Sequence, residues 1–190
     1  MRRDNPPTSA AARAISEWRR KRIKQQQERE AAVQRAITRI EQQPELADTE
    51  SYNAAMLGCR LLERPEEALV LWDQMRAAGV RPSPESYQHA LVSAMRLRRH
   101  DEALDVWQLL NADASTTPTA VEYAAAISAC ERTGDAARGL SLFDSMQARG
   151  IQPDSNTMAA AVLAASAARQ PGRASDILAR IELLGARPPM

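Results

Sequence analysis

The sequence predicts an all-α fold of stacked helix pairs, and three observations carry that prediction. A Gly-x-x-Pro signal recurs as GVRPS at 79–83, GIQPD at 150–154 and GARPP at 185–189. The last two copies lie 35 residues apart and the first two about twice that, which indicates an internal repeat. Apolar residues also recur at helical spacing within each repeat. Finally, the 190-residue chain is 44% hydrophobic but has one Phe, three Tyr and three Trp, and its many alanines favour close-packed helices.

The first element in the chain is a long predicted helix over residues 8–43, within a basic arm that spans 1–48. Thr8 or Ser9 is placed to cap this helix, and no Gly or Pro interrupts it. An apolar stripe near its end is expected to dock on the first repeat; it consists of Val33, Ala36, Ile37 and Ile40.

Four units of 35 or 36 residues follow, at 49–83, 84–119, 120–154 and 155–189. Each unit predicts two helices. In the first unit, the first helix is marked by Tyr52, Ala55, Met56 and Cys59 at i, i+3, i+4 and i+7. The second helix is marked by Ala68, Leu69, Leu71, Trp72 and Met75.

Gly and Pro residues predict where these helices start and stop. Pro65 suits the first turn of the second helix, Gly79 the left-handed position after it, and Pro82 the following turn. Unit two departs from the pattern, because ASTTP at 114–118 has the Pro but no Gly. Since a lone helix pair cannot bury both faces, the stacked pairs are expected to form a solenoid.

Unit four is the most degenerate repeat. Its first helix, MAAAVLAASAA, is almost entirely small and apolar, and Met158 stands where units one to three have Tyr. We therefore expect a partner or a second copy of the chain to cover this end.

Charge is divided unevenly along the chain. The overall net charge is +1, but residues 1–43 carry +6 and the remainder −5. A basic arm on an acidic body indicates that the arm meets a polyanion.

Catalytic and metal-binding patterns are missing from the sequence. His89 and His100 have no partners at ligand spacing, and there is no phosphate-binding Gly loop or nucleophile motif. Cys59 and Cys130 occupy equivalent places in two units and are predicted to be small core residues. No run of 18 apolar residues is present, so we expect no membrane insertion. We likewise expect no catalytic residue, cofactor, metal site, small-molecule substrate or appended catalytic domain.

The repeated positions resemble those of the pentatricopeptide repeat (PPR) family. Unit one has Tyr52-Asn53, Glu66-Glu67-Ala68-Leu69, Trp72, Met75, Gly79 and Pro82. Unit three has Tyr123, Gly134, Ala137, Leu140, Phe143, Met146, Gly150 and Pro153-Asp154. The related 34-residue tetratricopeptide repeat lacks the Met-Gly-Pro-Asp ending. The resemblance covers 49–189 and implies a right-handed α-solenoid whose first helices line a concave face. It also implies single-stranded RNA as ligand and a mitochondrial location, with the chloroplast as the alternative.

In family members that recognise RNA sequence, the fifth and last residues of each unit select a base. The corresponding pairs here are Asn53 with Ser83, Gln88 with Thr119, Ala124 with Asp154, and Ala159 with Pro189. Only the first pair looks functional, because an alanine side chain cannot hydrogen-bond a base. Glu50 and Glu85 also stand where the family usually has Val. The candidate RNA-binding residues of the array are therefore Asn53, Ser83, Arg96, Arg132 and Asp154, with the arginines alternatively serving only as solvated surface residues.

The arm supplies a second group of candidate RNA-binding residues: Arg13, Trp18, Arg19, Arg20, Lys21, Arg22, Lys24 and Arg29. Basic side chains surround the helix here, as on helices that lie along phosphates, and Trp18 is suited to stack on a base or insert into a protein groove. Two alternatives are a solvated capping helix and a mitochondrial targeting segment. Because targeting segments are poor in acids and Glu17 follows, only residues 1–16 suit the latter.

Three functions are open at this point. The first is a non-catalytic subunit of an organellar ribonucleoprotein, in particular the mitochondrial ribosome, that binds rRNA and neighbouring proteins. The second is a free organellar RNA-binding factor for transcript maturation, stability or translation. The third is a protein–protein scaffold. We favour the first, because the missing base-selecting residues count against the second and the basic arm against the third.

Overall fold

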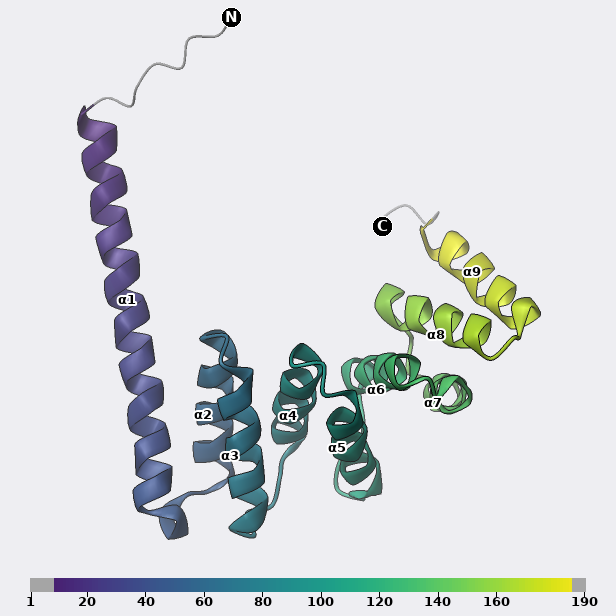
Figure 1. Ribbon diagram of the computed structural model, residues 1–190, viewed down its shortest axis with the longest axis horizontal. Helices are drawn as coiled ribbons and strands as arrows, with labels where there is room; N and C mark the ends of the chain where they lie inside the picture. The colour runs from purple at the N-terminus through teal and green to yellow at the C-terminus, as the bar shows by residue number, and fades with distance from the viewer. Residues whose placement is uncertain (1–8, 186–190) are drawn as a thin grey trace, which may run out of the picture.

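The structure is a computed structural model that describes the backbone of residues 9–185 and the side chains of residues 14–181. Within residues 9–185 it has helices and turns and no strand, so the predicted all-α solenoid is confirmed. One long helix precedes four helix pairs that stack into a curved array (Figure 1). The helices are α1 (Ser9–Gln42), a short 3₁₀ turn (Pro44–Leu46), α2 (Thr49–Leu61), α3 (Pro65–Ala77), α4 (Pro84–Arg96), α5 (His100–Ala112), α6 (Ala120–Thr133), α7 (Ala136–Ala148), α8 (Ser155–Ala167) and α9 (Pro171–Gly185). Thr8, one of the two expected caps of α1, lies outside the described residues.

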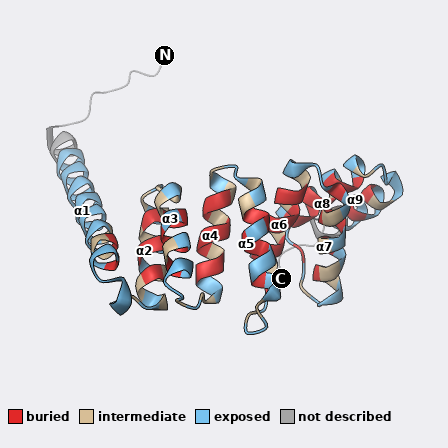
Figure 2. Cartoon of the chain, turned by 60° about the horizontal axis from the view of Figure 1, so that its bottom comes forward, coloured by how far each residue is buried: buried red, intermediate tan, exposed pale blue. Residues whose placement is uncertain are grey.

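Helix α1 covers the face of α2 that has no preceding repeat. Ile37 and Ile40 are buried in the core, and Val33 and Ala36 pack against it, which confirms the predicted stripe. Gly58 on α2 makes the close approach possible, because a Cβ atom there would lie 2.4 Å from Val33 Cγ2. Figure 2 shows that burial is confined to the end of α1 beside α2, and the rest of the helix projects away from the array.

Neighbouring units are joined by aromatic side chains. Trp72 on α3 packs against Tyr87 on α4 with 5.3 Å between ring centroids, and Trp107 on α5 packs against Tyr123 on α6 with 4.7 Å. All four side chains are buried. This contact explains why the repeat places an aromatic residue in the second helix of one unit and a Tyr in the first helix of the next.

The third junction lacks such a ring pair because unit four has Met158 in place of the Tyr. Phe143 packs in a separate cluster with Met158 and Ile177. One face of α8 is buried and consists largely of alanines, but Leu163 on another face remains 51% exposed. The cover expected over this end is therefore not supplied by the described part of the chain.

The turns between units follow the predicted Gly signal where the structure describes it. Gly79 and Gly150 have φ of +70° and +74°, and each follows a second helix. Gly185 is the last residue of α9, and the rest of the third signal lies outside the described residues. Unit two uses Asp113 instead, whose Oδ1 accepts hydrogen bonds from Ser115 N (3.0 Å) and Ser115 Oγ (2.6 Å). This side-chain turn replaces the missing Gly and accommodates the extra residue.

The turns inside the four helix pairs share a feature that sequence reasoning missed. The same position of each unit adopts the left-handed conformation: Glu63, Arg98, Gly134 and Arg169 have φ of 57°, 58°, 81° and 56°. Only unit three fills it with Gly, the residue that adopts this conformation without steric cost. Three units therefore hold local strain that the surrounding packing must offset.

Candidate nucleic-acid interface

The arm presents its basic residues to solvent. Every described side chain from Ala14 to Ala32 is exposed, which includes the candidates from Trp18 to Arg29. Trp18 is 56% exposed, and the guanidinium of Arg22 stacks on it at 4.8 Å from the ring centroid. Arg13 lies on the helical backbone of α1, but its side chain is outside the described ones.

Few carboxylates compensate these cations. Lys24 Nζ lies 3.9 Å from Glu28, and both side chains are exposed. Within the described residues no ion pair joins Arg19, Arg20 or Lys21 to a carboxylate. The arm therefore carries a strong net positive charge that the array does not neutralise.

The predicted base-selecting pair of unit one is brought together by the structure. Asn53 Nδ2 donates to Ser83 Oγ at 2.8 Å, and Asn53 Oδ1 accepts from Ser86 Oγ at 2.6 Å. Ser83 Oγ in turn donates to a carboxylate oxygen of Glu85 at 2.6 Å, which lowers the pKa of that carboxyl. A base would have to displace these internal partners to bond to Asn53 and Ser83.

The last residue of units one to three has a second role that sequence reasoning missed. Ser83, Thr119 and Asp154 are the N-caps of α4, α6 and α8, and Asp48 caps α2 in the same way. Asp154 Oδ1 accepts from Thr157 Oγ1 and Thr157 N at 2.6 and 2.7 Å, and these bonds lower the pKa of the Asp154 carboxyl. A Ser, Thr or Asp four residues before the buried Tyr or Met of each first helix is the available sequence signal for these caps.

Two arginines and a histidine meet on the first helices. Arg60 Nη1 lies 2.6 Å from His89 Nδ1, and Arg96 Nη1 donates to the backbone carbonyl of Arg60 at 3.5 Å. Because a guanidinium only donates, Nδ1 of His89 accepts and its proton resides on Nε2. Burial, and secondarily Arg60, lowers the pKa of His89 to about 4. Burial, followed by Arg96, also lowers the pKa of Arg60.

The arginines at the ends of the first helices differ in whether a carboxylate lies beside them. Arg96 is exposed at the end of α4 with no carboxylate within salt-bridge distance in the described part of the chain. Arg132, its equivalent in unit three, lies 3.1 Å from the carboxylate of Glu131 and is 54% exposed. Arg96 is therefore the better placed of the two for contact with an anion.

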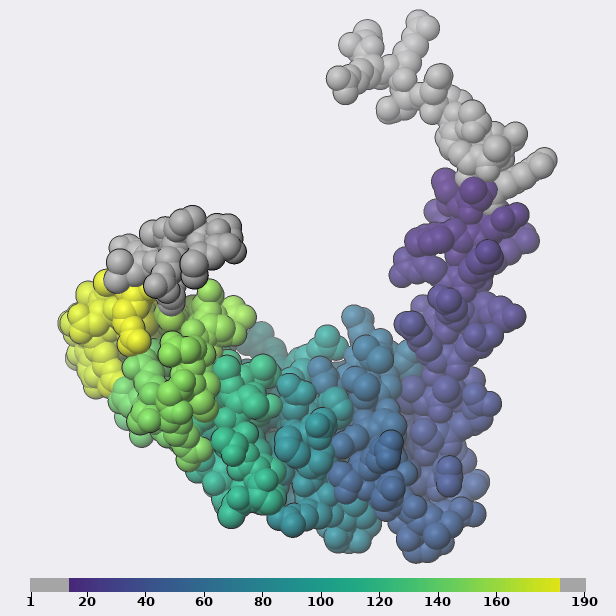
Figure 3. All heavy atoms as spheres, turned by 180° about the vertical axis from the view of Figure 1, so that it is seen from behind, coloured from purple at the N-terminus to yellow at the C-terminus, as the bar shows by residue number. Residues whose placement is uncertain are grey.

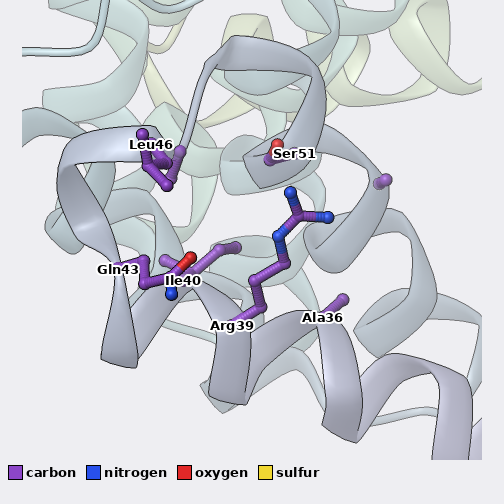
Figure 4. Close-up of a pocket in the computed structure, with 8 residues that line it drawn as sticks. Ala36, Arg39, Ile40, Gln43, Leu46 and Ser51 are labelled. Carbon is purple, nitrogen blue, oxygen red and sulfur yellow. The ribbon is translucent and has the colours of Figure 1, made fainter.

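A cavity of about 170 Å³ lies at the junction of α1, the 3₁₀ turn and α2 (Figure 4). Arg39 and Ser51 point into it above apolar walls that include Ile40 and Leu46. Asp48 lies nearby; its bonds from Ser51 lower the pKa of its carboxyl, and Arg39 adds a smaller lowering. None of the predicted site residues lines this cavity.

Three features bear on other classes of site. Cys59 and Cys130 are buried free thiols, as predicted, and burial raises the pKa of each to about 11. Among the described side chains, no three His, Cys, Asp or Glu residues gather as metal ligands do. Within residues 9–185, no helix combines the length and apolar character needed to cross a membrane.

Residues 50–80 and 123–151 each match the family model of the PPR repeat. Units one and three are therefore pentatricopeptide repeats. The matched segments fall in units one and three, the two units that carry the family pattern most completely. No curated protein sequence matches this chain.

Solved structures of PPR proteins share its fold. The PPR domain of protein-only RNase P 1 from Arabidopsis thaliana, in complex with tRNA, is similar with a TM-score of 0.68 and 16% identity, covering 92% of each chain. Maize PPR10 in complex with an 18-nt psaJ RNA element has a TM-score of 0.57 and 24% identity over 85% of this chain. Nuclear proteinaceous RNase P 2 from A. thaliana has a TM-score of 0.66 and 16% identity over 80% of this chain. This chain spans 24% of PPR10 and 34% of RNase P 2.

Proposed function

We propose that this protein is a non-catalytic RNA-binding subunit of an organellar ribonucleoprotein, in particular the mitochondrial ribosome. In this proposal the arm contacts rRNA and the array contacts neighbouring proteins. The observation that carries the proposal is the separation of the two surfaces. An exposed, net basic helix stands beside a net acidic array, and the buried stripe on α1 joins the two.

The comparisons support RNA as the ligand. Two PPR structures with the same fold are complexes with RNA, one with tRNA and the other with an 18-nt psaJ RNA element. Phosphates attract clusters of Lys and Arg, and this attraction supplies much of the affinity of protein–nucleic acid complexes. The basic arm of this chain provides such a cluster outside the repeats.

The side chains of the first helices favour contact with a protein over recognition of bases. Ala124 and Ala159 cannot hydrogen-bond a base, and the polar atoms of Asn53 and Ser83 are already engaged within the protein. Exposed aliphatic side chains lie on the first helices instead, including Leu57, Val121 and Leu163 at 43%, 49% and 51% exposure. An aliphatic surface without free base-selecting groups suits a protein neighbour.

A free RNA-binding factor is the second candidate function. The observation that favours it is the pair Arg60 and Arg96, in which Arg96 Nη1 donates to the backbone carbonyl of Arg60 at 3.5 Å. Such a pair on the first helices attracts a phosphate of a strand that follows the array. This candidate predicts contacts with several transcripts through the repeats rather than with one RNA through the arm.

Ultraviolet crosslinking in intact mitochondria tests these functions. A tagged full chain is crosslinked, the recovered RNA is sequenced, and the crosslinked peptides are mapped. We expect one dominant rRNA site joined to residues 13–29. Many transcript sites joined to the first helices would instead establish the free factor. Absence of RNA above background would overturn both and leave the protein–protein scaffold. Fractionation of the tagged chain tests the proposed mitochondrial location, and recovery in another compartment would overturn that part.

A further inference from the structure

The exposed half of α1, residues 14–32, carries cations on all of its sides. An α-helix turns about 100° per residue, so Arg19, Arg20, Lys21 and Arg22 point in four directions that together span the full circumference. Arg19 and Arg22 define one side of the helix. Arg20 and Lys21 define the side about 180° away.

The side of this half that faces the array lines two open clefts, one of them formed by Gln27 and Glu30 with Arg64 of the array. Arg22, Gln25, Gln26 and Arg29 line an open cleft of about 460 Å³ whose other wall is Leu61, Leu62 and Glu63 at the turn between α2 and α3. Arg20 and Lys21 are absent from this lining and exposed to solvent. The array therefore provides no partner for the cations on the outer side. A ligand bound only in the cleft would not contact the cations on the outer side.

The exposed half also forms its helix without tertiary support. Its sequence is dominated by Ala, Arg, Lys, Gln and Glu, which have high helix propensity. One end is fixed to the array by Ile37 and Ile40, and in Figure 3 the exposed half rises from one end of the arc. A preformed helix loses little conformational entropy when it binds. It is also narrow enough, at roughly 10–12 Å across, to be surrounded by its ligand.

We propose that the exposed half of α1 lies in a groove of folded, base-paired RNA, with phosphates on both of its sides. An extended single strand passes along one side of a helix and neutralises one side only. A groove places a phosphate backbone on each side, which matches cations on opposite sides of α1. The major groove of regular A-form RNA is deep and narrow, so the matching site is a duplex opened by a bulge or internal loop. The inference rests on the proposed function, because it specifies the class of RNA that the arm binds.

The test measures binding of the purified full chain to three fluorescent RNAs of equal length: a hairpin with a three-nucleotide bulge, an uninterrupted hairpin and an unpaired strand. Fluorescence anisotropy gives the affinity of each at several salt concentrations. We expect the bulged hairpin to bind at least about tenfold more tightly than the unpaired strand. Its log affinity should also fall more steeply with log salt, because each duplex phosphate contact adds about 0.9 to that slope.

Two double variants test the prediction of contacts on both sides. One is Arg19→Gln with Arg22→Gln, and the other is Arg20→Gln with Lys21→Gln. Each removes two charges, and Gln retains helix propensity, which circular dichroism checks. We expect each variant to weaken bulged-hairpin binding by roughly tenfold or more and to reduce the salt slope by about 1.8. The control, Arg149→Gln with Arg180→Gln, removes two exposed charges remote from the arm and should change binding less than about threefold.

Three results would overturn the inference in distinguishable ways. If the unpaired strand binds as tightly as the bulged hairpin, the arm still binds RNA and only the groove is wrong. If one double variant weakens binding and the other has no effect, the arm contacts its ligand on one side. If none of the three RNAs binds, both the inference and the RNA-binding function fail. An acidic protein surface then becomes the ligand to test.

Discussion

Replacing Gly58 with Ala should displace the arm from the array. The added Cβ would lie 2.4 Å from Val33 Cγ2 and 3.4 Å from Val33 Cβ and Cγ1. Ordinary carbon–carbon contacts are about 3.5–4.0 Å, so the two helices must separate by about 1 Å or Val33 must leave its position. A Val side chain on a helix has one strongly preferred rotamer, so movement of α1 is the expected response.

The size of the effect is obtained by comparison with a second glycine. Overpacking costs about 1–3 kcal/mol, whereas replacement of a helical Gly by Ala gains about 1 kcal/mol from helix propensity. A Cβ atom added to Gly172 on α9 would have no neighbour within 4 Å, so Gly172→Ala reports a Gly-to-Ala substitution without a clash. The difference in free energy of unfolding between the Gly58 and Gly172 variants should therefore be about 1–3 kcal/mol.

Hydrogen exchange and urea denaturation of the full chain measure both consequences. In Gly58→Ala, backbone amides of residues 33–41 should exchange faster while those of α6 and α7 keep their protection. Adding Val33→Ala to this variant removes the clashing methyl groups and should recover the protection. The reasoning is refuted if Gly58→Ala is stabilised as much as Gly172→Ala and the amides of residues 33–41 remain protected.

Three further predictions concern the array. Arg98 is a left-handed residue with φ of 58°, so Arg98→Gly should relieve strain and raise the free energy of unfolding by about 0.5–1 kcal/mol in urea denaturation. A lower free energy of unfolding would show that the residue is not strained. Asp154→Ala removes the N-cap of α8 and should cost about 1 kcal/mol, whereas Asp154→Asn, which still accepts the capping bonds, should cost less; equal losses would exclude the cap as the cause. The pKa of His89 is about 4 in the folded chain and about 6.5 when unfolded, so between these values only the unfolded chain gains the proton and stability falls as the pH drops. Thermal unfolding from pH 7 to pH 4 should thus show a loss of stability in the unmodified chain. His89→Gln should make that loss smaller by about 2 kcal/mol, a figure that allows for solvent screening. Identical pH profiles of the two chains would contradict the assignment.

The helices and their order were predictable because their signals are local. The stripe of Val33, Ile37 and Ile40 and the repeated apolar positions of each unit follow the helical period, which any amphipathic helix must show. Gly79 and Gly150 mark turns by the same logic, since a left-handed residue favours Gly wherever it occurs. The sequence also located the cations of the arm, although not whether the array would compensate them.

The candidate site was predicted less completely. The sequence paired Asn53 with Ser83 through the family pattern, but it could not show that the two side chains bond to each other. It also treated Ser83 and Asp154 as base contacts and missed their capping role. For His89 the sequence showed only that no partner stands at ligand spacing, and it could not show the contact with Arg60 of the preceding unit.

The sequence by itself determined that this protein is a helical repeat array with a basic helical arm, because periodicity, stop signals and charge are properties of neighbouring residues. The tertiary structure decided which polar groups remain available to a ligand. That depends on contacts between residues about 30 positions apart, which exist only once one unit has stacked on the next. Stacking occupies Asn53, Ser83 and His89 within the array, and it leaves the cations of α1 exposed because no unit covers them.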